Sequence, residues 1–283
     1  MLIDLHTHSY VSDGTESPGD LVRAAAQQGL SVVALTDHDQ TSGWEEAAQT
    51  ALETGIGLVP GMEISCRTDN HISVHLLAYL HDPLNEDLLA EINRARSSRV
   101  TRAQRMVELL SEDFPITWDT VQEQTHEDAT IGRPHIADAL VAAGVVGDRS
   151  EAFARILVPG SRYYVGHYAV DPVEAVELVK RANGVPVFAH PLASARGRVV
   201  AENVFHDMID AGLAGVEVFH RDNPEHARTQ LLKLATQEDL IVTGSSDYHG
   251  TGKPNRLAEN TTARDQLERI LELGTGSHSV GIS

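Results

Sequence analysis

The stretch Ile3-Asp4-Leu5-His6-Thr7-His8 is an apolar alternation that ends in two histidines. Side chains two positions apart in a β-strand point to the same face, so His6 and His8 are suited to bind one ligand together. The alternation predicts a short strand over residues 2–6, with the histidine pair at its carboxyl end. Asp13 follows a few residues later as a further candidate ligand.

The same arrangement recurs along the chain, where apolar runs that are typical of strands lead into histidines and carboxylates. We expect strands near residues 2–6, 31–36, 57–63, 72–79, 185–189, 214–219 and 240–244. The candidate ligands at these strands are His38, Glu63, His75, His190, Asp247 and His249. In barrels and open α/β sheets the active site lies where the strands end, so these side chains are expected to converge.

The expected cluster consists of imidazoles and carboxylates, which suit Zn, Mn or Fe. No thiolate cluster competes for the role, because Cys66 is the single cysteine. We interpret Cys66 as a small buried residue, and no intramolecular disulfide is possible. The residues therefore predict a metal enzyme with more than one ion.

The composition of the 283 residues is that of a globular protein, and no apolar run approaches the ~20 residues of a membrane helix. The chain enters a strand without a basic region and an apolar signal segment, so we expect a cytoplasmic protein with no membrane partner. The net charge of −19 argues against a broad basic surface for long duplex nucleic acid. A short anionic substrate stays open, because several divalent ions would make the site itself positive.

Strand-like and helical runs alternate through most of the chain, which predicts an α/β fold with a mainly parallel sheet. Helix starts are expected where a capping residue precedes proline, at Ser17-Pro18, Asp171-Pro172 and Asn223-Pro224. The stretch Ser42-Gly43-Trp44-Glu45 has the spacing of a capping box.

Residues 91–165 interrupt the alternation with helical patterns alone, and we expect them to form an inserted subdomain. Residues 1–90 and 166–283 would then form the metal-binding part. Arginines recur at three-residue intervals early in the insertion, at Arg96, Arg99, Arg102 and Arg105. Short amphipathic segments follow near residues 117–125, 134–143 and 150–158.

The ordered set of candidate ligands resembles the PHP (polymerase and histidinol phosphatase) superfamily. The residues that carry the resemblance are His6-Thr7-His8, Thr36-Asp37-His38, Glu63, His75, Ala189-His190-Pro191 and Asp247-Tyr248-His249. The helical insertion with Gly132-Arg133-Pro134-His135 is similar to the branch of nucleoside 3′,5′-bisphosphate phosphatases and the 5′→3′ exoribonuclease RNase AM. The resemblance implies a distorted (β/α)7 barrel with three divalent ions, Mn, Fe or Zn, at the carboxyl ends of the strands.

The resemblance also implies how the ligands are shared. His6, His8, Glu63 and Asp247 would hold one ion; Glu63 would bridge to a second, shared with His75 and His190; Asp13, His38 and His249 would hold the third. Asp37 and Asp39 flank His38 and could orient metal-bound imidazoles through hydrogen bonds, with helix capping as the alternative for Asp39.

A carboxylate that bridges two ions leaves room for a metal-activated water, because bound ions lower the pKa of water. We therefore predict hydrolysis of a phosphomonoester without a covalent phospho-enzyme. Glu63, His190, Asp247 and His249 are the predicted catalytic residues.

Anion recognition is assigned to the insertion, which would cap the substrate. Arg99 and Arg102 share a helix face, and guanidinium groups suit bidentate phosphate contacts. Arg133 and His135 lie at the start of an expected helix, whose free amides favour anions. A second phosphate bound there would select a nucleotide with phosphates at two positions, or a short RNA 5′ end. The arginine row could instead be a solvated face that pairs with acidic neighbours.

Several alternatives stay open. The chain could be a 5′→3′ exoribonuclease on short RNA, a histidinol-phosphate phosphatase or a non-catalytic metal-binding regulatory module. An amidohydrolase also begins with His-x-His, but no lysine at a strand end is placed to bridge its ions. We interpret four further histidines as surface or structural residues, with a rim role still open for His220 and for Arg196: His167, His206, His220 and His226. The sequence leaves the oligomeric state undetermined.

Overall fold

The computed structural model describes residues 1–125 and 131–282, and seven strands in it form one sheet in chain order. They are β1 (Ile3–Asp4), β2 (Val32–Leu35), β3 (Gly57–Arg67), β4 (Ser73–Tyr79), β5 (Val185–Phe188), β6 (Gly215–Phe219) and β7 (Ile241–Gly244). A parallel bridge between Thr7 and Tyr248 joins the chain beyond β1 to the chain beyond β7. The sheet is therefore nearly closed, as the expected distorted barrel requires.

Strand β4 runs antiparallel to β3 and β5, whereas the other neighbouring strands are parallel. This reversal places the beginning of β4 at the edge where the parallel strands end. His75 lies near that beginning, opposite Ser65 of β3. A strand end is thus not what brings His75 to the common edge; the direction of β4 does so.

One face of the strands points into the barrel, because apolar residues from six strands pack into one cluster. That cluster includes Ile3, Val32, Val59, Leu77, Val187 and Ile241, together with Leu267 and Ile270 of α10 (Arg264–Leu273). Tyr79 crosses this core, and its hydroxyl donates to the Leu5 carbonyl at 2.8 Å. The buried layer fixes the strands on which the candidate ligands stand. Cys66 of β3 is buried as expected.

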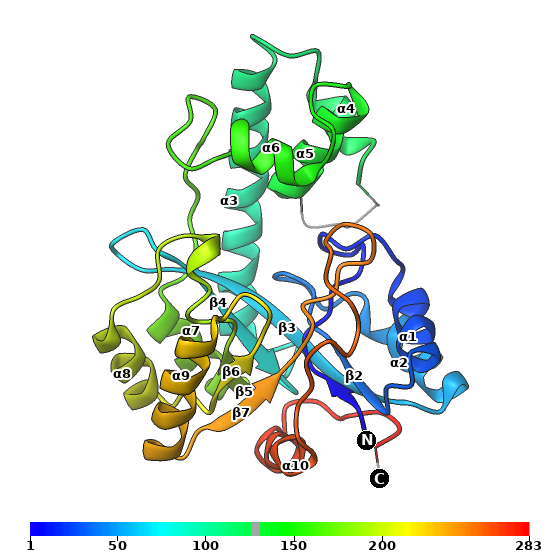
Figure 1. Cartoon of the computed structure of the whole chain (residues 1–283), viewed down its shortest axis with the longest axis vertical. Helices are drawn as coiled ribbons and strands as arrows, with labels where there is room; N and C mark the ends of the chain where they lie inside the picture. Colours follow the sequence, from blue (N-terminus) through cyan, green and yellow to red (C-terminus); the bar gives the residue numbers. More distant parts are fainter. Residues whose placement is uncertain (126–130, 283) are drawn as a thin grey trace.

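Helices cover the outside of the barrel on both sides (Figure 1). They are α1 (Pro18–Gln27), α2 (Trp44–Thr54), α7 (Pro172–Arg181), α8 (Glu202–Ala211) and α9 (Glu225–Gln237). Ser17 and Asp171 cap α1 and α7 as predicted. The other two predicted caps are wrong. Gly43 precedes α2 without a side-chain cap. The Asn223 side-chain amide instead donates to the Glu217 carbonyl of β6 and accepts from the Leu192 backbone N–H in the loop after β5.

Four helices form the insertion and stand away from the barrel (Figure 1). They are α3 (Glu86–Leu110), α4 (Trp118–Gln122), α5 (Arg133–Ala142) and α6 (Arg149–Arg155). Their apolar side chains pack into a core of their own around Met106, Leu110, Ile136 and Leu140. Helix α3 begins before residue 91, so one continuous helix leads from the barrel into the insertion. Within the described residues, no helix is both long and apolar enough to cross a membrane.

Candidate functional site

The first cluster of candidate ligands joins both ends of the sheet. The Nε2 atoms of His6 and His8 lie 3.0 Å apart, and Glu63 Oε2 lies 3.2 and 3.1 Å from them. Asp247 Oδ1 completes the group at 3.6 and 3.4 Å from the same two nitrogens. All four side chains are buried. β1, β3 and the loop after β7 therefore converge on one point.

These distances are those of atoms that share a metal ion. Two ligand atoms that each lie about 2.1 Å from one ion are about 3.0 to 3.4 Å apart at octahedral or tetrahedral angles. The separations of 3.0 to 3.4 Å fall in that range, and the longest, 3.6 Å from His6 Nε2 to Asp247 Oδ1, lies just beyond it. The donor set, two imidazoles and two carboxylates, also fits a divalent transition metal.

Glu63 stands at the centre of the site, with donor atoms around both of its oxygens. Its Oε1 lies 2.7 Å from His75 Nδ1 and 3.3 Å from His190 Nε2. Its Oε2 faces the first cluster and also lies 3.3 Å from His38 Nδ1. A carboxylate in this arrangement can bridge two ions.

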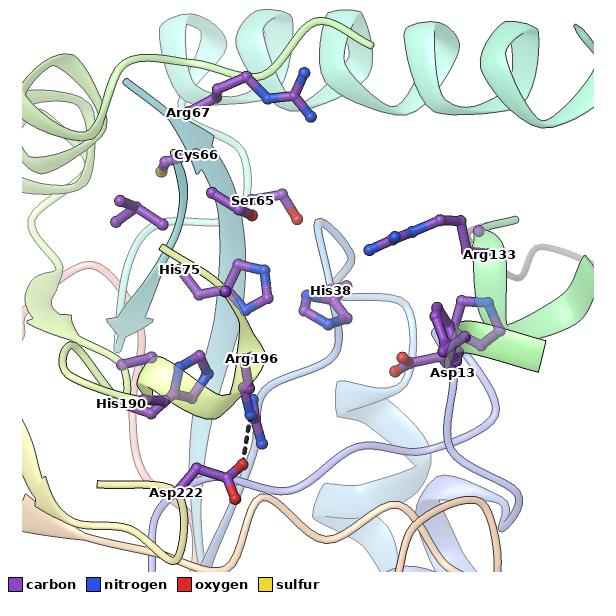
Figure 2. Close-up of a pocket in the computed structure, with 18 of the residues that line it drawn as sticks. Asp13, His38, Ser65, Cys66, Arg67, His75, Arg133, His190, Arg196 and Asp222 are labelled. Atoms are coloured by element: carbon purple, nitrogen blue, oxygen red, sulfur yellow. Dashed lines mark hydrogen bonds and ion pairs between the residues drawn. The ribbon is translucent and has the colours of Figure 1, made fainter. Parts of the chain in front are cut away.

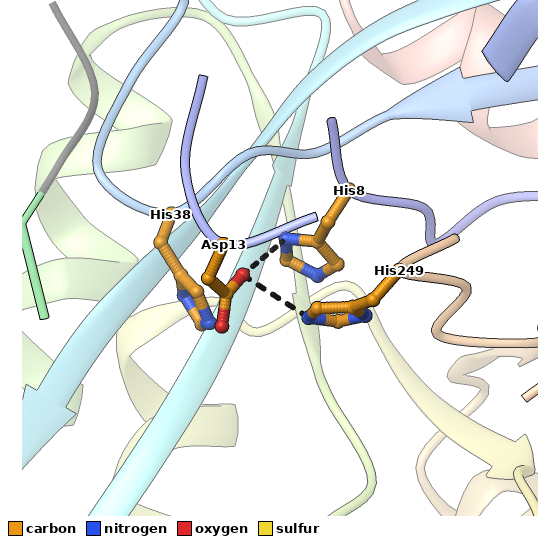
Figure 3. Close-up of side chains that lie close together, drawn as sticks. All are labelled: His8, Asp13, His38 and His249. Carbon is orange, nitrogen blue, oxygen red and sulfur yellow. Dashed lines mark ion pairs between the residues drawn. The ribbon is translucent and has the colours of Figure 1, made fainter. Parts of the chain in front are cut away.

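A further cluster gathers His8, Asp13, His38 and His249 (Figure 3). Asp13 Oδ1 lies 3.1 Å from His249 Nε2 and 3.8 Å from His8 Nδ1. His38 Nδ1, His75 Nδ1 and His249 Nε2 are buried and make no hydrogen bond among the described residues. Ring nitrogens left open in this way are available to a metal ion. The structure thus brings all nine predicted ligand residues together.

Glu217 of β6 orients two of these residues and is not among the site residues predicted from the sequence. One of its oxygens accepts a hydrogen bond from His6 Nδ1 at 3.0 Å, and the other accepts from the His190 backbone N–H at 2.8 Å. Burial would raise the pKa of Glu217, but the neighbouring His6 outweighs burial and the pKa is lowered to about 2. A carboxylate inside an otherwise apolar strand was the signal for this role.

Asp37 and Asp39 make no hydrogen bond to an imidazole in the described part of the chain, so the prediction that they orient metal-bound histidines through hydrogen bonds is wrong. Asp37 accepts hydrogen bonds from the Ser9 backbone N–H at 2.9 Å and from Ser12 Oγ at 2.6 Å. Asp39 accepts from the Ser65 backbone N–H at 2.8 Å, and Arg99 lies 3.3 Å away. Both carboxylates hold loops together beside the site.

The second oxygen of Asp247 faces cations. Arg196 Nη2 lies 2.5 Å from it, Lys253 Nζ 3.2 Å and His220 Nε2 3.6 Å. His220 is fully buried and its Nε2 has no hydrogen-bond partner in the described part of the chain, so it is neither a surface nor a satisfied structural histidine. Arg196 also pairs with Asp222 (Figure 2).

A cavity of about 840 Å³ opens over the candidate ligands. His38, His75 and His190 lie along it, and Arg133 points toward them from the insertion (Figure 2). On the insertion side its lining includes Arg67, Arg99, Arg102, Arg133 and His167, which we call the cationic wall. The cationic wall and the candidate metal ligands therefore face the same space.

The cationic wall is organised around His167. Arg67 Nη2 and Arg102 Nη1 each lie 3.1 Å from His167 Nδ1. Burial and then the neighbouring arginines lower the pKa of His167 to about 2, so the ring stays neutral. Arg133 donates to the Leu157 carbonyl at 3.2 Å. No signal in the sequence associated Arg67 and His167 with the insertion arginines.

Most of this positive charge is not neutralised. Among the described residues, Arg67, Arg102 and Arg133 form no ion pair with a carboxylate, whereas Arg99 pairs with Asp39. His135 does not line the cavity but is buried, with its Nδ1 accepting from the Gly132 backbone N–H at 3.1 Å. The exposed positions of His206 and His226 agree with the surface role expected for them.

Comparison with known proteins places this site in a family. The model of the PHP domain matches residues 4–140. A 3′,5′-nucleoside bisphosphate phosphatase of Chromobacterium violaceum is 33% identical over 92% of this chain and 91% of its own. A 5′-3′ exoribonuclease of Haemophilus influenzae is 31% identical over 87% of this chain and 89% of its own.

Among solved structures, a Bifidobacterium adolescentis protein assigned as a metal-dependent phosphoesterase superposes with a TM-score of 0.94. It is 47% identical, with 96% of each chain covered. The shared fold extends through the insertion as well as the barrel, because so little of either chain is left out. The protein therefore belongs to the PHP family and is a metal-dependent phosphoesterase, a hydrolase.

Proposed function

We propose that the protein hydrolyses a phosphomonoester of a nucleotide that carries phosphates at two positions, such as a nucleoside 3′,5′-bisphosphate. The observation that carries this proposal is the cationic wall, which faces the candidate metal ligands across one cavity. One phosphate would be cleaved at the ligands, while the second binds the wall. Guanidinium groups without carboxylate partners suit that second phosphate.

Three divalent ions, Mn, Fe or Zn, are proposed to occupy the ligand clusters. His6, His8, Glu63 and Asp247 would hold the first; Glu63, His75 and His190 the second; Asp13, His38 and His249 the third. When bound, such ions lower the pKa of water from ~15.7 to about 7 and neutralise charge on phosphoryl oxygens. Glu63 belongs to two sets because each of its oxygens faces a different group of histidines.

Hydrogen bonds from the protein determine which ring nitrogen of His6 and of His249 is free to bind an ion. His6 donates from Nδ1 to Glu217, so its Nε2 lone pair points at the first cluster. His249 donates from Nδ1 to the Asp247 carbonyl at 2.8 Å, which leaves Nε2 open beside Asp13. Fixing the tautomer of a ligand in this way strengthens metal binding.

We assign the second phosphate to Arg67, Arg102 and Arg133. Their guanidinium groups line the cavity and carry charge that no carboxylate in the described residues offsets. Arg99 contributes less, since Asp39 already neutralises it. His135 is not assigned a substrate contact, because it is buried outside the cavity lining.

A 5′→3′ exoribonuclease that acts on short RNA is the second candidate. The cavity continues past the candidate ligands to Arg198, Arg221 and Lys253, which could contact the phosphate of a following nucleotide. The relatives include both kinds of enzyme. The net charge of −19 favours the shorter substrate.

Phosphate release from four substrates separates these functions. The Mn-reconstituted protein would be given adenosine 3′,5′-bisphosphate, AMP, histidinol phosphate and a 5′-phosphorylated RNA oligomer. We expect the fastest release from the bisphosphate, with the remaining mononucleotide showing which ester is cut. Stepwise release of mononucleotides from RNA would establish the exoribonuclease instead, and preference for histidinol phosphate would refute both.

A further inference from the structure

The insertion reaches the barrel through Arg149, the first residue of α6. Its Nε and Nη2 form a bidentate ion pair with the carboxylate of Asp138 in α5, at 2.5 and 2.6 Å. Its third nitrogen, Nη1, donates to the backbone carbonyl of Asp13 at 3.0 Å. One side chain thus connects two insertion helices to the loop that carries a candidate metal ligand.

His135 supports the same loop one residue earlier. Its Nδ1 accepts a hydrogen bond from the Gly132 backbone N–H at 3.1 Å, so the neutral ring carries its proton on Nε2. The remaining partner of the ring is the backbone of Ser12. The insertion therefore holds two consecutive residues, Ser12 and Asp13.

The other loops of this ligand cluster also meet insertion arginines. Arg99 pairs with Asp39, which directly follows His38, at 3.3 Å. Arg149 packs against Gly252 in the loop after His249, where a Cβ atom would lie 2.5 Å from Nη1. Figure 1 shows this loop after β7 rising from the barrel toward α5 and α6. The loops carrying Asp13, His38 and His249 are thus all in contact with the insertion.

We propose that Arg149 is a positioning residue that makes metal binding by Asp13, His38 and His249 depend on the docking of the insertion. The proposal rests on the third ion site of the proposed function. Arginine is suited to the task because its planar fork satisfies Asp138 and the Asp13 carbonyl at once. Asp138 neutralises the guanidinium, which would otherwise repel an ion held beside Asp13.

Metal titration without substrate tests the proposal. Wild-type protein, Arg149→Met and Arg155→Met would each be titrated with Mn²⁺ alone and followed by calorimetry. Arg155 is the matched control, an exposed arginine on the same helix whose partner is Glu151. We expect one of three binding events to weaken about 10- to 100-fold in Arg149→Met, the loss typical for a partner of a ligand, with the other two unchanged.

Two further variants keep the test decisive if Arg149→Met does not fold. Asp138→Asn retains the guanidinium but removes its counter-charge, and Arg149→Lys retains the charge but loses the fork. Both should weaken the same event, while activity returns at higher Mn²⁺ concentration. Unchanged affinities, or equal weakening of every event, would overturn the positioning role. Fewer than three events in the wild type would overturn the ion assignment itself, before any variant is compared.

Discussion

The ligand rim of the barrel, formed by the nine candidate metal ligands, and the cationic wall suit opposite charges by different means. At the rim, imidazoles and carboxylates form clusters whose ligand atoms lie within 4.8 Å of one another, and Glu217 orients His6 and His190. At the wall, three arginines keep their charge without carboxylate partners in the described residues. In the proposed function, a substrate phosphate and metal ions would meet in the one cavity that both surfaces line.

The difference shows that the backbone fixes the candidate metal ligands more tightly than the arginines of the wall. Most rim residues stand on strands or in the short loops that follow them, so small side-chain changes should abolish chemistry. Wall residues reach the cavity on long side chains from β3, α3 and α5, so their loss should weaken binding and spare the reaction.

The rim should show the largest effect. Asp247→Asn removes a carboxylate that faces four histidines, and we expect turnover to fall by more than about 100-fold, beyond the loss seen even for partners of ligands. Phosphate release at saturating Mn²⁺ measures the loss, and a thermal melt should show an intact fold. Asp210→Asn, which changes an exposed carboxylate on α8, is the matched control. Activity near that of the wild type would remove Asp247 from the site.

A substitution of Glu217, which contacts candidate ligands without being one, should weaken metal binding. Glu217→Gln weakens the acceptor for His6 Nδ1, and we expect metal affinity to fall about 10- to 100-fold. Calorimetric titration with Mn²⁺ is the measurement, with the exposed Glu202→Gln as control. Equal affinities in both variants would mean that the His6 tautomer does not depend on Glu217.

A change in the wall should act on substrate binding alone. Arg133→Ala removes a hydrogen-bond donor to the second phosphate, worth about 1.5–3 kcal/mol, so KM for a bisphosphate should rise about 10- to 100-fold while kcat is retained. KM for AMP should change little. Arg162→Ala, an exposed arginine of the insertion paired with Glu112, serves as control. An unchanged KM for the bisphosphate would contradict the wall's role.

A change of pH should have a smaller effect, and it should act on metal binding at the rim but not on the cationic wall. Burial alone would lower the pKa of His8, but hydrogen bonds to Asp247 and Glu63 outweigh it and raise the pKa to about 9 in the metal-free protein. Burial would also lower the pKa of the neighbouring His6, but Glu63 and Glu217 outweigh it and raise that pKa as well. An entering ion must displace these protons, so metal affinity should rise by at least about tenfold per pH unit from pH 7 toward 9. The charge of the cationic wall should not change with pH in the same way, since His167 stays neutral over this range. Titrations with Mn²⁺ at pH 7, 7.5 and 8 would show a flat affinity if the proton is absent.

The rim could be predicted from the sequence because it obeys a local rule. Apolar runs that lead into His, Asp or Glu mark the strands and most of the candidate ligands, and all seven strands form where they are predicted. The nine side chains predicted as ligands lie together. The direction of β4 follows from pairing with distant strands, which no local pattern specifies. The association of Arg67 with His167 is also beyond sequence patterns, since it depends on the segment before α7 lying along β3, where Cys66 and Val170 form a parallel bridge.

Glu217 and Asn223 are two positions where the prediction from the sequence is incomplete or wrong, each for a physical reason. Glu217 interrupts an apolar strand, and a buried charge must have partners, so its position alone pointed to the site. Asn223 was taken for a helix cap because it precedes proline, yet its amide is used by the backbone of β6. Local rules fail here because tertiary partners compete for the same polar groups.

Cys66 gives the molecule a practical property. The chain has a single cysteine, and burial raises the pKa of its thiol well above the usual value, so thiol reagents have little to react with. A cysteine introduced at the exposed Arg155 would therefore take up a fluorophore selectively. Because the native cysteine would stay unlabelled, fluorescence from position 155 would report movements of the insertion against the barrel.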